Sequence, residues 1–338
     1  MSRPLSFAAR ALVVVAFLLS ALFAAGIVWH QAPNDWAVRA VLLGAWAAFC
    51  AVCVIRYLRE ESSRTLLVYA AAFVMLIAWF ALLEPRNDRV WSHEMTQLLT
   101  YSRVGDTIVV SNVRNFDWTG PETADERWET RRYDLSSLRA LDVLSLYWKG
   151  PNVAHTYFSF VWADGEALSL SVEIRKEKGE VYSPVGGFFK AYELSTLAGD
   201  ERDFYGWRVH YPIEDIQLFR TRATPAQARM LLLKLLDFAN ELAKTPAFYN
   251  TLTDNCTTEV WMLTETLGHG KPLDWRLFAS GHLPDFLYDL KVLDTSRPLN
   301  ELRAKGHILP AARKALDQDL SGAAFSNAIR GDIPRISE

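Results

Sequence analysis

Three long apolar runs near the start of the chain constrain its fold more than any other feature. They span Ala11–Trp29, Ala40–Ile55 and Thr65–Leu83. A helix needs about 20 apolar residues to cross a bilayer, and the second run reaches that length if it begins at Trp36 and Arg39 turns its charge to the interface. A cleaved signal peptide is the alternative for the first run, but that run is long for one and two more follow. We therefore expect residues 1–85 to form three transmembrane helices.

The placement of arginine orients these helices. The loop between the first two runs, residues 30–36, contains no Lys or Arg, whereas the N-terminus and the loop before the third run contain Arg3, Arg10, Arg56, Arg59 and Arg64. Basic residues accumulate on the cytoplasmic side of membranes. Three membrane crossings then place the rest of the chain on the side of the membrane opposite to the cytoplasm. The sequence thus predicts a multi-pass protein of a bacterial inner membrane with its C-terminal domain in the periplasm.

Beyond residue 85 the composition becomes that of an ordinary folded domain. The 338-residue chain has a net charge of −3, which argues against nucleic-acid binding, because that function requires a concentrated basic surface. We expect a periplasmic cysteine-enzyme domain over residues 86–318 and a loose C-terminal tail over residues 319–338. Cys50 and Cys53 lie within the second apolar run, so Cys256 is the only cysteine outside the membrane. An unpaired thiol in an oxidising compartment points to a chemical role.

An alternation of apolar and polar residues predicts a β-hairpin formed by Val153–Trp162 and Glu166–Arg175. A two-residue turn at Asp164-Gly165 would mix both kinds of residue on each face. A three-residue loop, with Gly165 left-handed, shifts the register by one and separates them. One face then carries Phe158, Phe160, Trp162, Leu168, Leu170, Val172 and Ile174, and the other carries His155, Tyr157, Ser159, Ser169, Ser171 and Glu173. We predict this second register, in which Glu173 is the cross-strand neighbour of His155.

The remaining pattern indicates an α+β domain with an antiparallel sheet. Strands are expected at Thr107–Val113, Leu141–Trp148, Ala191–Ala198 and Trp207–Tyr211. Helices are expected at Pro225–Lys244 and from about Asn255 to Leu267, with Gly268 ending the second. Residues 115–132 show no clear period, and Tyr182–Phe189 is expected to be a loop.

Cys256 is the candidate nucleophile because it lies at the start of the second helix. Thr253 or Asp254 is expected to cap that helix, whose N-terminal partial positive charge favours thiolate over thiol. Apolar residues follow Cys256 at helical spacing. We therefore expect it to lie on the packed face of the helix, against the small residues of the hairpin's polar face. A buried, inert cysteine is the alternative.

His155 is the candidate base, since imidazole titrates near neutral pH. Glu173 would accept a hydrogen bond from the other ring nitrogen and orient the ring. Each also has a structural alternative, as a histidine within a strand or as a solvated acid. A single external cysteine combined with a histidine and an acid on one polar face favours catalysis. Tyr157, Asn255 and Arg175, which shares a strand face with Glu173, are the expected substrate-binding residues.

No motif indicates a cofactor or a metal. The chain contains no H-E-x-x-H, P-loop, G-x-G-x-x-G or G-x-S-x-G, and no C-x-x-C outside the apolar runs. Gly186-Gly187 fits a turn better than a phosphate-binding loop. His93 lies near the membrane linker, and no paired ligand spacing is shown by His210, His269, His282 and His307. We expect chemistry by side chains alone.

Several segments resemble a known family. They are N-D-R-x-W at 87–91, N-V-R-N-F-D at 112–117, A-H-T-Y-F-S-F at 154–160, S-V-E-I-R-K-E-K-G-E at 171–180, Y-E-L at 192–194, D-E-R-D at 200–203 and F-Y-N-T-L-T-D-N-C-T-T at 248–258. Together they resemble the DUF4105 family, also called the Lnb N-terminal periplasmic domain, over residues 86 to about 315. The Asn-Cys-Thr-Thr block is quite specific.

The resemblance implies a permuted papain-like fold of the NlpC/P60 type, in which the histidine precedes the cysteine, as His155 precedes Cys256 here. It also implies a periplasmic location. The member that gives the family its name is a lipoprotein N-acyltransferase, which moves a fatty acyl chain onto the amino group of a diacylated lipoprotein. Membrane helices follow the domain in that enzyme, whereas here three precede it. We therefore expect shared chemistry rather than a shared substrate.

Three functions are compatible with these features. The leading hypothesis is a membrane-anchored periplasmic thiol acyltransferase, in which Cys256 takes an acyl chain from a phospholipid donor and passes it to an amine such as a lipoprotein N-terminus. The second is a peptidoglycan amidase or endopeptidase with the same Cys–His pair. The third is a non-catalytic envelope binding module. An acyl adduct on Cys256 distinguishes the first from the second, and a fully buried, unreactive Cys256 would favour the third.

The arginine distribution yields a test of topology. Alkaline phosphatase fused at Asp319 is expected to be active, because that enzyme needs an oxidising compartment to form its disulfides. The same reporter fused after Arg59 is expected to be inactive. Activity of a cytoplasmic reporter at Asp319 would refute the orientation.

Overall fold

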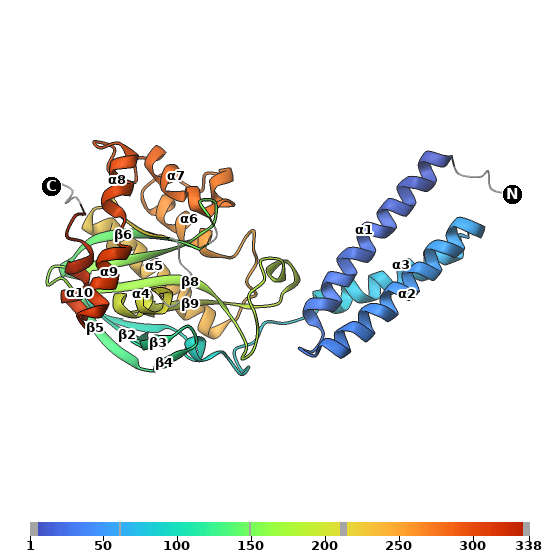
Figure 1. Cartoon of the computed structure of the whole chain (residues 1–338), viewed down its shortest axis with the longest axis horizontal. Helices are drawn as coiled ribbons and strands as arrows, with labels where there is room; N and C mark the ends of the chain where they lie inside the picture. Colours follow the sequence, from blue (N-terminus) through green and yellow to red (C-terminus); the bar gives the residue numbers. More distant parts are fainter. Residues whose placement is uncertain (1–5, 61, 149, 210–214, 334–338) are drawn as a thin grey trace. The chain divides into compact units, whose positions relative to one another are not determined.

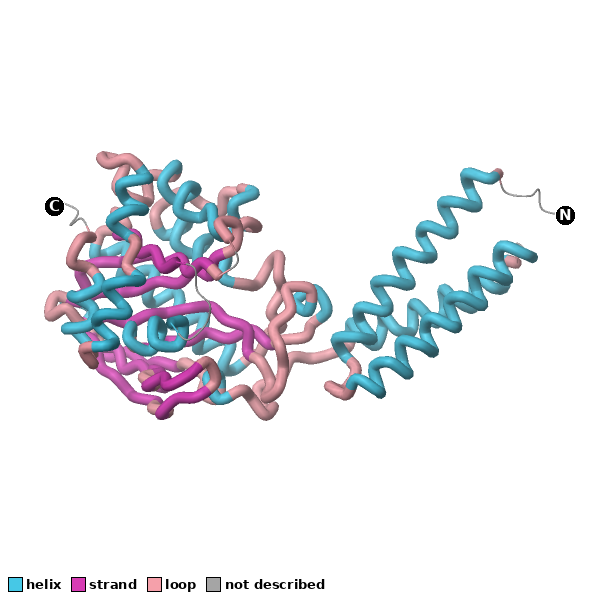
Figure 2. Tube along the Cα trace, viewed as in Figure 1, coloured by secondary structure: helices cyan, strands magenta, loops and turns pink. Residues whose placement is uncertain are grey.

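The computed structural model describes residues 6–60, 62–148, 150–209 and 215–333. The chain forms two compact units. One, the helical unit, comprises residues 1–86 and 179–192, and the other, the sheet unit, comprises residues 87–178 and 193–338. Figure 1 labels their elements, and Figure 2 shows that the strands belong to the sheet unit.

The helical unit contains α1 (Phe7–Gln31), α2 (Trp36–Glu60) and α3 (Ser63–Ala81). Each of these helices is long and apolar enough to cross a membrane, which agrees with the three apolar runs. Helix α2 begins at Trp36, as the extended second run requires. Cys50 and Cys53 are buried free thiols that pack with Phe17 and Tyr69.

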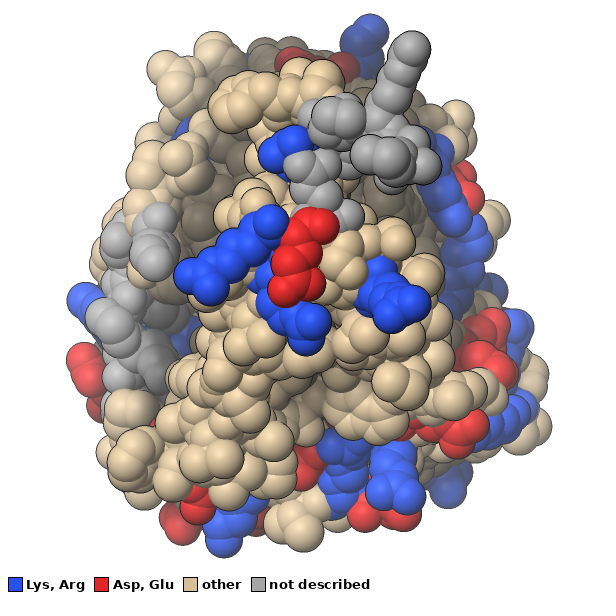
Figure 3. Space-filling view, turned by 90° about the vertical axis from the view of Figure 1, so that its right-hand side faces the viewer, with Lys and Arg blue, Asp and Glu red and all other residues tan. Residues whose placement is uncertain are grey.

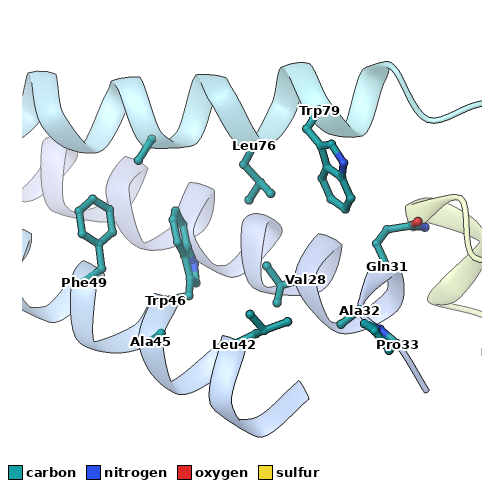
Figure 4. A pocket seen from close by; sticks show the side chains of 11 residues that line it. Val28, Gln31, Ala32, Pro33, Leu42, Ala45, Trp46, Phe49, Leu76 and Trp79 are labelled. Atoms are coloured by element: carbon teal, nitrogen blue, oxygen red, sulfur yellow. The ribbon is translucent and has the colours of Figure 1, made fainter. Parts of the chain in front are cut away.

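A cavity of about 560 Å³ lies between these helices. Figure 4 shows its mostly apolar lining, which includes Trp46 of α2 and Leu76 and Trp79 of α3, with Gln31 at the end of α1. Figure 3 shows a small group of charged side chains near the middle of its face, surrounded by residues without charge. A cavity with such a lining is suited to a hydrocarbon chain.

A loop from later in the chain belongs to the helical unit. It spans residues 179–192 and contains the short 3₁₀ helix η3 (Gly186–Phe189). Gln31 Nε2 donates to the carbonyl oxygens of Phe189 at 2.6 Å and Lys190 at 2.9 Å, and Lys190 Nζ donates to the carbonyl of Phe80 at 2.9 Å. Gly26 is required here, because a Cβ at this position would lie 2.3 Å from the ring of Phe189. The sequence predicts the loop but not its attachment to the helices.

The described part of the sheet unit contains an eight-stranded sheet in the order β1-β2-β9-β8-β7-β6-β10, with β5 also paired to β2. Its strands are β1 (Thr100–Val104), β2 (Thr107–Arg114), β5 (Trp128–Asp134), β6 (Leu138–Tyr147), β7 (Ala154–Trp162), β8 (Ala167–Arg175), β9 (Glu193–Gly199) and β10 (Asp215–Arg220). A separate pair is formed by β3 (Asp117–Gly120) and β4 (Thr123–Asp125). Among the described strands the pairings are antiparallel, except for one parallel contact between β2 and β9. The predicted α+β class is confirmed.

Helices cover both faces of this sheet. The face that carries Phe158 and Phe160 packs against α5 (Pro225–Lys244), α6 (Cys256–Thr266), α7 (Leu283–Asp289) and α8 (Leu299–Gly306). The opposite face, which carries Tyr157, packs against α4 (Glu201–Val209), α9 (Leu309–Asp317) and α10 (Gly322–Ile329). In Figure 1, α4 lies in front of the strands. The remaining 3₁₀ turns are η1 (His93–Met95), η2 (Leu135–Ser137), η4 (Trp275–Leu277) and η5 (Ser280–His282).

Several sequence predictions for the sheet unit are confirmed. Helix α5 has the predicted bounds, with a capping box between Thr224 and Gln227 and Pro225 at its start. Gly268, at a φ of +85°, follows the end of α6. The strands predicted at Thr107–Val113 and Leu141–Trp148 correspond to β2 and β6.

Two other predictions are wrong, and one stretch for which no element was predicted is structured. Residues 207–209 end helix α4 rather than begin a strand, because Phe204, Tyr205 and Trp207 are buried at helical spacing; Tyr211 lies outside the described residues. Residues 322–329 form α10, so this part of the tail is not loose: Phe325 is fully buried, and Arg330 pairs with Asp142 at 2.8 Å. The stretch at 115–132, which shows no period, contains β3, β4 and the start of β5.

A buried ion pair joins two of the motif segments. Arg114 of β2 and Asp203 of α4 are both 0% exposed, and their Nη2 and Oδ1 atoms lie 2.8 Å apart. Asp203 also accepts the backbone N–H of Phe116 at 2.7 Å and the indole N–H of Trp118 at 3.0 Å. A charge can be buried when it is paired and hydrogen-bonded in this way. The motif residues N-V-R-N-F-D and D-E-R-D therefore fasten β2 to α4.

This ion pair predicts a large loss of stability in Asp203→Ala. Removing one partner leaves the charge of Arg114 buried and uncompensated, which costs about 3–5 kcal/mol. Urea unfolding of the full chain in detergent measures the change. Asp106→Ala is the control, because Asp106 is 55% exposed beside Arg229 and should change stability by less than about 1 kcal/mol. Equal effects of the two substitutions would contradict this account.

Candidate active site

The predicted hairpin has the three-residue loop. Trp162 donates its backbone N–H to Glu166 at 2.8 Å, and Gly165 adopts a φ of +89°. The strand pairing runs from Val161 opposite Ala167 to Phe158 opposite Leu170, which is the predicted register. It places His155 and Glu173 on the same face, as expected.

The ladder between β7 and β8 then stops. Hydrogen-bonded pairs alternate along an antiparallel ladder, so the pairs 162/166, 160/168 and 158/170 predict that Thr156 and Val172 would form the next one. In the described ladder, however, Thr156 and Val172 do not pair. Strand β7 remains paired with β6 as far as Ala154, and β8 remains paired with β9 as far as Arg175. The two strands therefore stop pairing here, and we call this interruption of the ladder the split.

Side chains meet across the split. His155 Nε2 lies 3.0 Å from Glu173 Oε1 and 2.8 Å from Ser171 Oγ. Ser171 donates to Glu173 Oε1 at 3.0 Å, and Arg208 Nη2 of α4 donates to the same oxygen at 3.3 Å. The predicted contact between His155 and Glu173 is present. Because a carboxylate accepts and does not donate, we assign the imidazole proton to Nε2, which leaves the Nδ1 lone pair available to take a proton.

Glu173 is held as a carboxylate. Burial acts to raise its pKa, but the charge and hydrogen bond of His155, the charge of Arg208 and the hydrogen bond of Ser171 outweigh burial and lower the pKa to about 2. Its side chain is only 11% exposed, so solvent screens these interactions weakly. A residue that orients a histidine base must accept a hydrogen bond from it, and a charged carboxylate does so.

Helix α6 presents Cys256 as its first residue. The cap is Asn255, not Thr253 or Asp254 as predicted: its side chain accepts the N–H of Thr257 at 2.7 Å. The Asn255 amide also donates to the carbonyls of Asn250 at 3.2 Å and Thr251 at 2.6 Å. Asn255 is 4% exposed and fixes the turn before Cys256, and its role as a substrate ligand stays a prediction.

The face against which α6 packs was predicted wrongly. Val260 and Leu263 of α6 join the cluster around Phe158, whereas the small-residue face with His155 is covered by α4. Cys256 therefore approaches the sheet from the side opposite to His155. It reaches the split itself, because the backbone N–H of Thr156, the residue after His155, interacts with its thiol. Cys256 is partly exposed.

The surroundings of Cys256 oppose the expected effect of the helix N-terminus on its thiol. Burial raises its pKa to about 12, and the negative charge of Glu173 acts in the same direction. The backbone N–H groups of Thr156 and of Cys256 itself oppose this rise but are outweighed. The helix N-terminus alone therefore does not ionise the sulfur, and a base must remove its proton.

Glu259 is a site residue that the sequence analysis missed. It lies three residues after Cys256 on α6, and positions i and i+3 share a helix face. It is 0% exposed and lies near the backbone N–H of Val172, which faces the split. The helical spacing of a glutamate from the candidate nucleophile was the available signal.

Comparison with known families agrees with the resemblance seen in the motifs. Residues 124–281 match the Lnb N-terminal periplasmic domain. The matched segment contains His155, Glu173 and Cys256, and it is shorter than the span over which the motifs extend. No curated protein and no solved structure matches the chain. The match and the three membrane-length helices make this a membrane-anchored protein with a periplasmic domain.

Two other predicted substrate-binding residues of the Lnb-type domain have structural roles. Arg175 is 2% exposed and donates to the carbonyls of Met95 at 3.0 Å and Thr96 at 3.1 Å, and its guanidinium lies 4.1 Å from the ring centre of Trp91. It thus holds the N-terminal segment of the domain against the end of β8. Tyr157 is 0% exposed and packs on Phe204 of α4. Neither side chain is open to a substrate.

The lowered pKa of Glu173 predicts an acid-dependent stability. A carboxyl whose pKa falls on folding stabilises the fold above its ordinary pKa of 4.5, and this contribution is lost as the pH falls toward about 2. We expect the wild type to lose on the order of 3 kcal/mol relative to Glu173→Gln across this range, since one pKa unit corresponds to about 1.4 kcal/mol. Urea unfolding at a series of pH values measures the difference. Glu122→Gln, at an exposed position, is the control; parallel curves for wild type and Glu173→Gln would contradict the assignment.

Proposed function

We propose that this protein is a membrane-anchored periplasmic acyltransferase, which moves a fatty acyl chain from a phospholipid to an amine such as a lipoprotein N-terminus through an acyl-Cys256 intermediate. The observation that carries the proposal is the split between β7 and β8. There, the thiol of Cys256 meets the backbone beside His155, and His155 is oriented by the ionised Glu173. A thiol, a base and an orienting acid are the groups that covalent acyl transfer requires.

In the first half-reaction His155 Nδ1 takes the thiol proton as the sulfur attacks the ester carbonyl of the phospholipid. A C–S bond forms and the carbonyl oxygen becomes an oxyanion, which the backbone N–H of Cys256 at the helix N-terminus is suited to stabilise. The tetrahedral adduct collapses with cleavage of the ester C–O bond. The leaving alkoxide takes the proton from the imidazolium, which yields a lysophospholipid and an acyl-thioester.

In the second half-reaction the amine attacks the thioester carbonyl. His155 accepts a proton from the amine, the C–S bond breaks and the proton returns to sulfur, which restores the neutral thiol. The acyl chain is now an amide. Both halves use the same base, and the charge of Glu173 stabilises each imidazolium as it forms.

The membrane anchor supports a lipid donor over a peptidoglycan substrate. Helices α1 to α3 are long enough to cross a bilayer, and the cavity between them is lined mainly by apolar side chains. A phospholipid acyl chain has the matching chemistry. The inner bacterial membrane, crossed three times, is the location that this function requires.

Mass spectrometry of the intact protein incubated with phospholipid tests the proposal. The wild type is expected to gain the mass of one acyl chain, and Cys256→Ala is expected to gain none. His155→Ala should acylate about 10²- to 10⁴-fold more slowly, the usual contribution of a general base.

The matched control is the double variant Cys50→Ala, Cys53→Ala, because both cysteines lie in α2 and should not affect acylation. An adduct that persists in Cys256→Ala, or a wild type that releases lysophospholipid without ever carrying an acyl group, would sink the proposal. Cleavage of peptidoglycan fragments without lipid acylation would instead favour the amidase hypothesis.

A further inference from the structure

Two carboxyl groups lie at the split, and they differ in the partners that surround them. Glu173 faces His155 and the cation Arg208 and is ionised. Glu259 is 0% exposed, and neither of its oxygens forms a full hydrogen bond within the part of the chain that the structure describes. An ionised carboxylate cannot be buried without such partners, whereas a neutral acid can. When two carboxyl groups are held in different charge states at one site, they serve different roles.

The position of Glu259 follows from the broken ladder. Thr156 and Val172 are the residues that would exchange the next pair of backbone hydrogen bonds between β7 and β8. Instead, the N–H of Thr156 faces the thiol of Cys256, and the N–H of Val172 faces the carboxyl of Glu259. One turn of α6 thus supplies two side chains to the two N–H groups that the split leaves without a strand partner.

The charges around Glu259 agree with a neutral acid. Burial raises its pKa well above the ordinary value, and the negative charge of Glu173, which faces it from β8, adds to the rise. Cys256 faces it from the same helix. His155 and Arg208 are engaged with Glu173, and the backbone N–H of Val172 lowers the pKa by less than burial and Glu173 raise it.

We propose that Glu259 is a positioning residue that remains protonated and donates a hydrogen bond from its carboxyl O–H to the sulfur of Cys256 as negative charge develops there. No proton leaves Glu259 in this step: the thiol proton goes to His155, and the acid O–H only turns toward the thiolate. The inference rests on the proposed function in one respect, that the sulfur of Cys256 is the reacting atom.

A purely structural role for Glu259 makes the opposite prediction about stability. A side chain retained for the fold destabilises the protein when it is replaced. A buried carboxyl without full hydrogen bonds has already lost its hydration, so an apolar residue of similar shape should be tolerated or should stabilise the fold. Glu259→Leu is therefore expected to raise the unfolding midpoint in urea while it impairs the thiol.

Alkylation of Cys256 by iodoacetamide measures thiolate formation without any substrate. The rate is followed from neutral to alkaline pH in full-length protein with Cys50 and Cys53 replaced by Ala, so that Cys256 is the only thiol. Glu259→Leu removes the donor and is expected to slow alkylation near neutral pH by roughly 10- to 100-fold, the effect of losing one hydrogen bond to a charged group. Glu259→Gln keeps a donor and should remain within a few-fold of the parent. Glu265→Gln, at a more exposed position of the same helix, is the matched control and should not change the rate.

Each outcome of these measurements supports or overturns the proposed role of Glu259. Slow alkylation in Glu259→Leu, near-normal alkylation in Glu259→Gln and unreduced stability of the Leu variant support the proposal. Faster alkylation in both variants would show that Glu259 is ionised and repels the thiolate, which overturns it, as would a Gln variant as slow as the Leu variant. Alkylation requires no acyl donor, so a failure of the proposed acyl transfer would leave this result standing, and a failure here would leave the acyl-Cys256 test unaffected.

Discussion

The site depends on an interrupted hydrogen-bond ladder. An antiparallel hairpin lowers its energy by continuing to pair, and backbone N–H groups left without partners inside a protein are costly. Strands β7 and β8 nevertheless separate after Phe158 and Leu170 while each stays paired to its outer neighbour. The N-terminus of α6 fills the opening.

The motif residues explain how the opening persists. Arg175, at the end of β8, donates to the segment that contains Met95 and Thr96, and this ties β8 to the chain before β1. The buried pair of Arg114 and Asp203 fastens α4 against β2, and α4 carries Arg208 to Glu173. Buried guanidinium groups make several directional bonds at once and resist displacement. Residues that appeared to mark a binding site therefore hold the framework around it.

The charge pattern of the site follows from this framework. A thiol at a helix N-terminus is ordinarily acidified, but here burial and the charge of Glu173 reverse that effect for Cys256. Glu173 accepts hydrogen bonds from Arg208 and Ser171 and lies beside His155, so it is the group that carries the negative charge at rest. A site that keeps its sulfur neutral until a base acts is protected from oxidation, because the thiolate is the reactive form.

The sequence by itself determined the features that rest on local periodicity: the three membrane-length helices, α5 with its capping box, and the hairpin register that joins His155 to Glu173. Alternation and helical spacing are short-range patterns, and a slip of one residue would expose every apolar side chain of the hairpin. The tertiary structure alone decided which face α6 covers, that residues 207–209 end a helix, and that Arg330 closes a buried network. It also decided that the Glu259 oxygens lack full hydrogen bonds and that the pKa of Cys256 is raised. These depend on which distant groups surround a side chain, and no pattern within one segment encodes its neighbours from another.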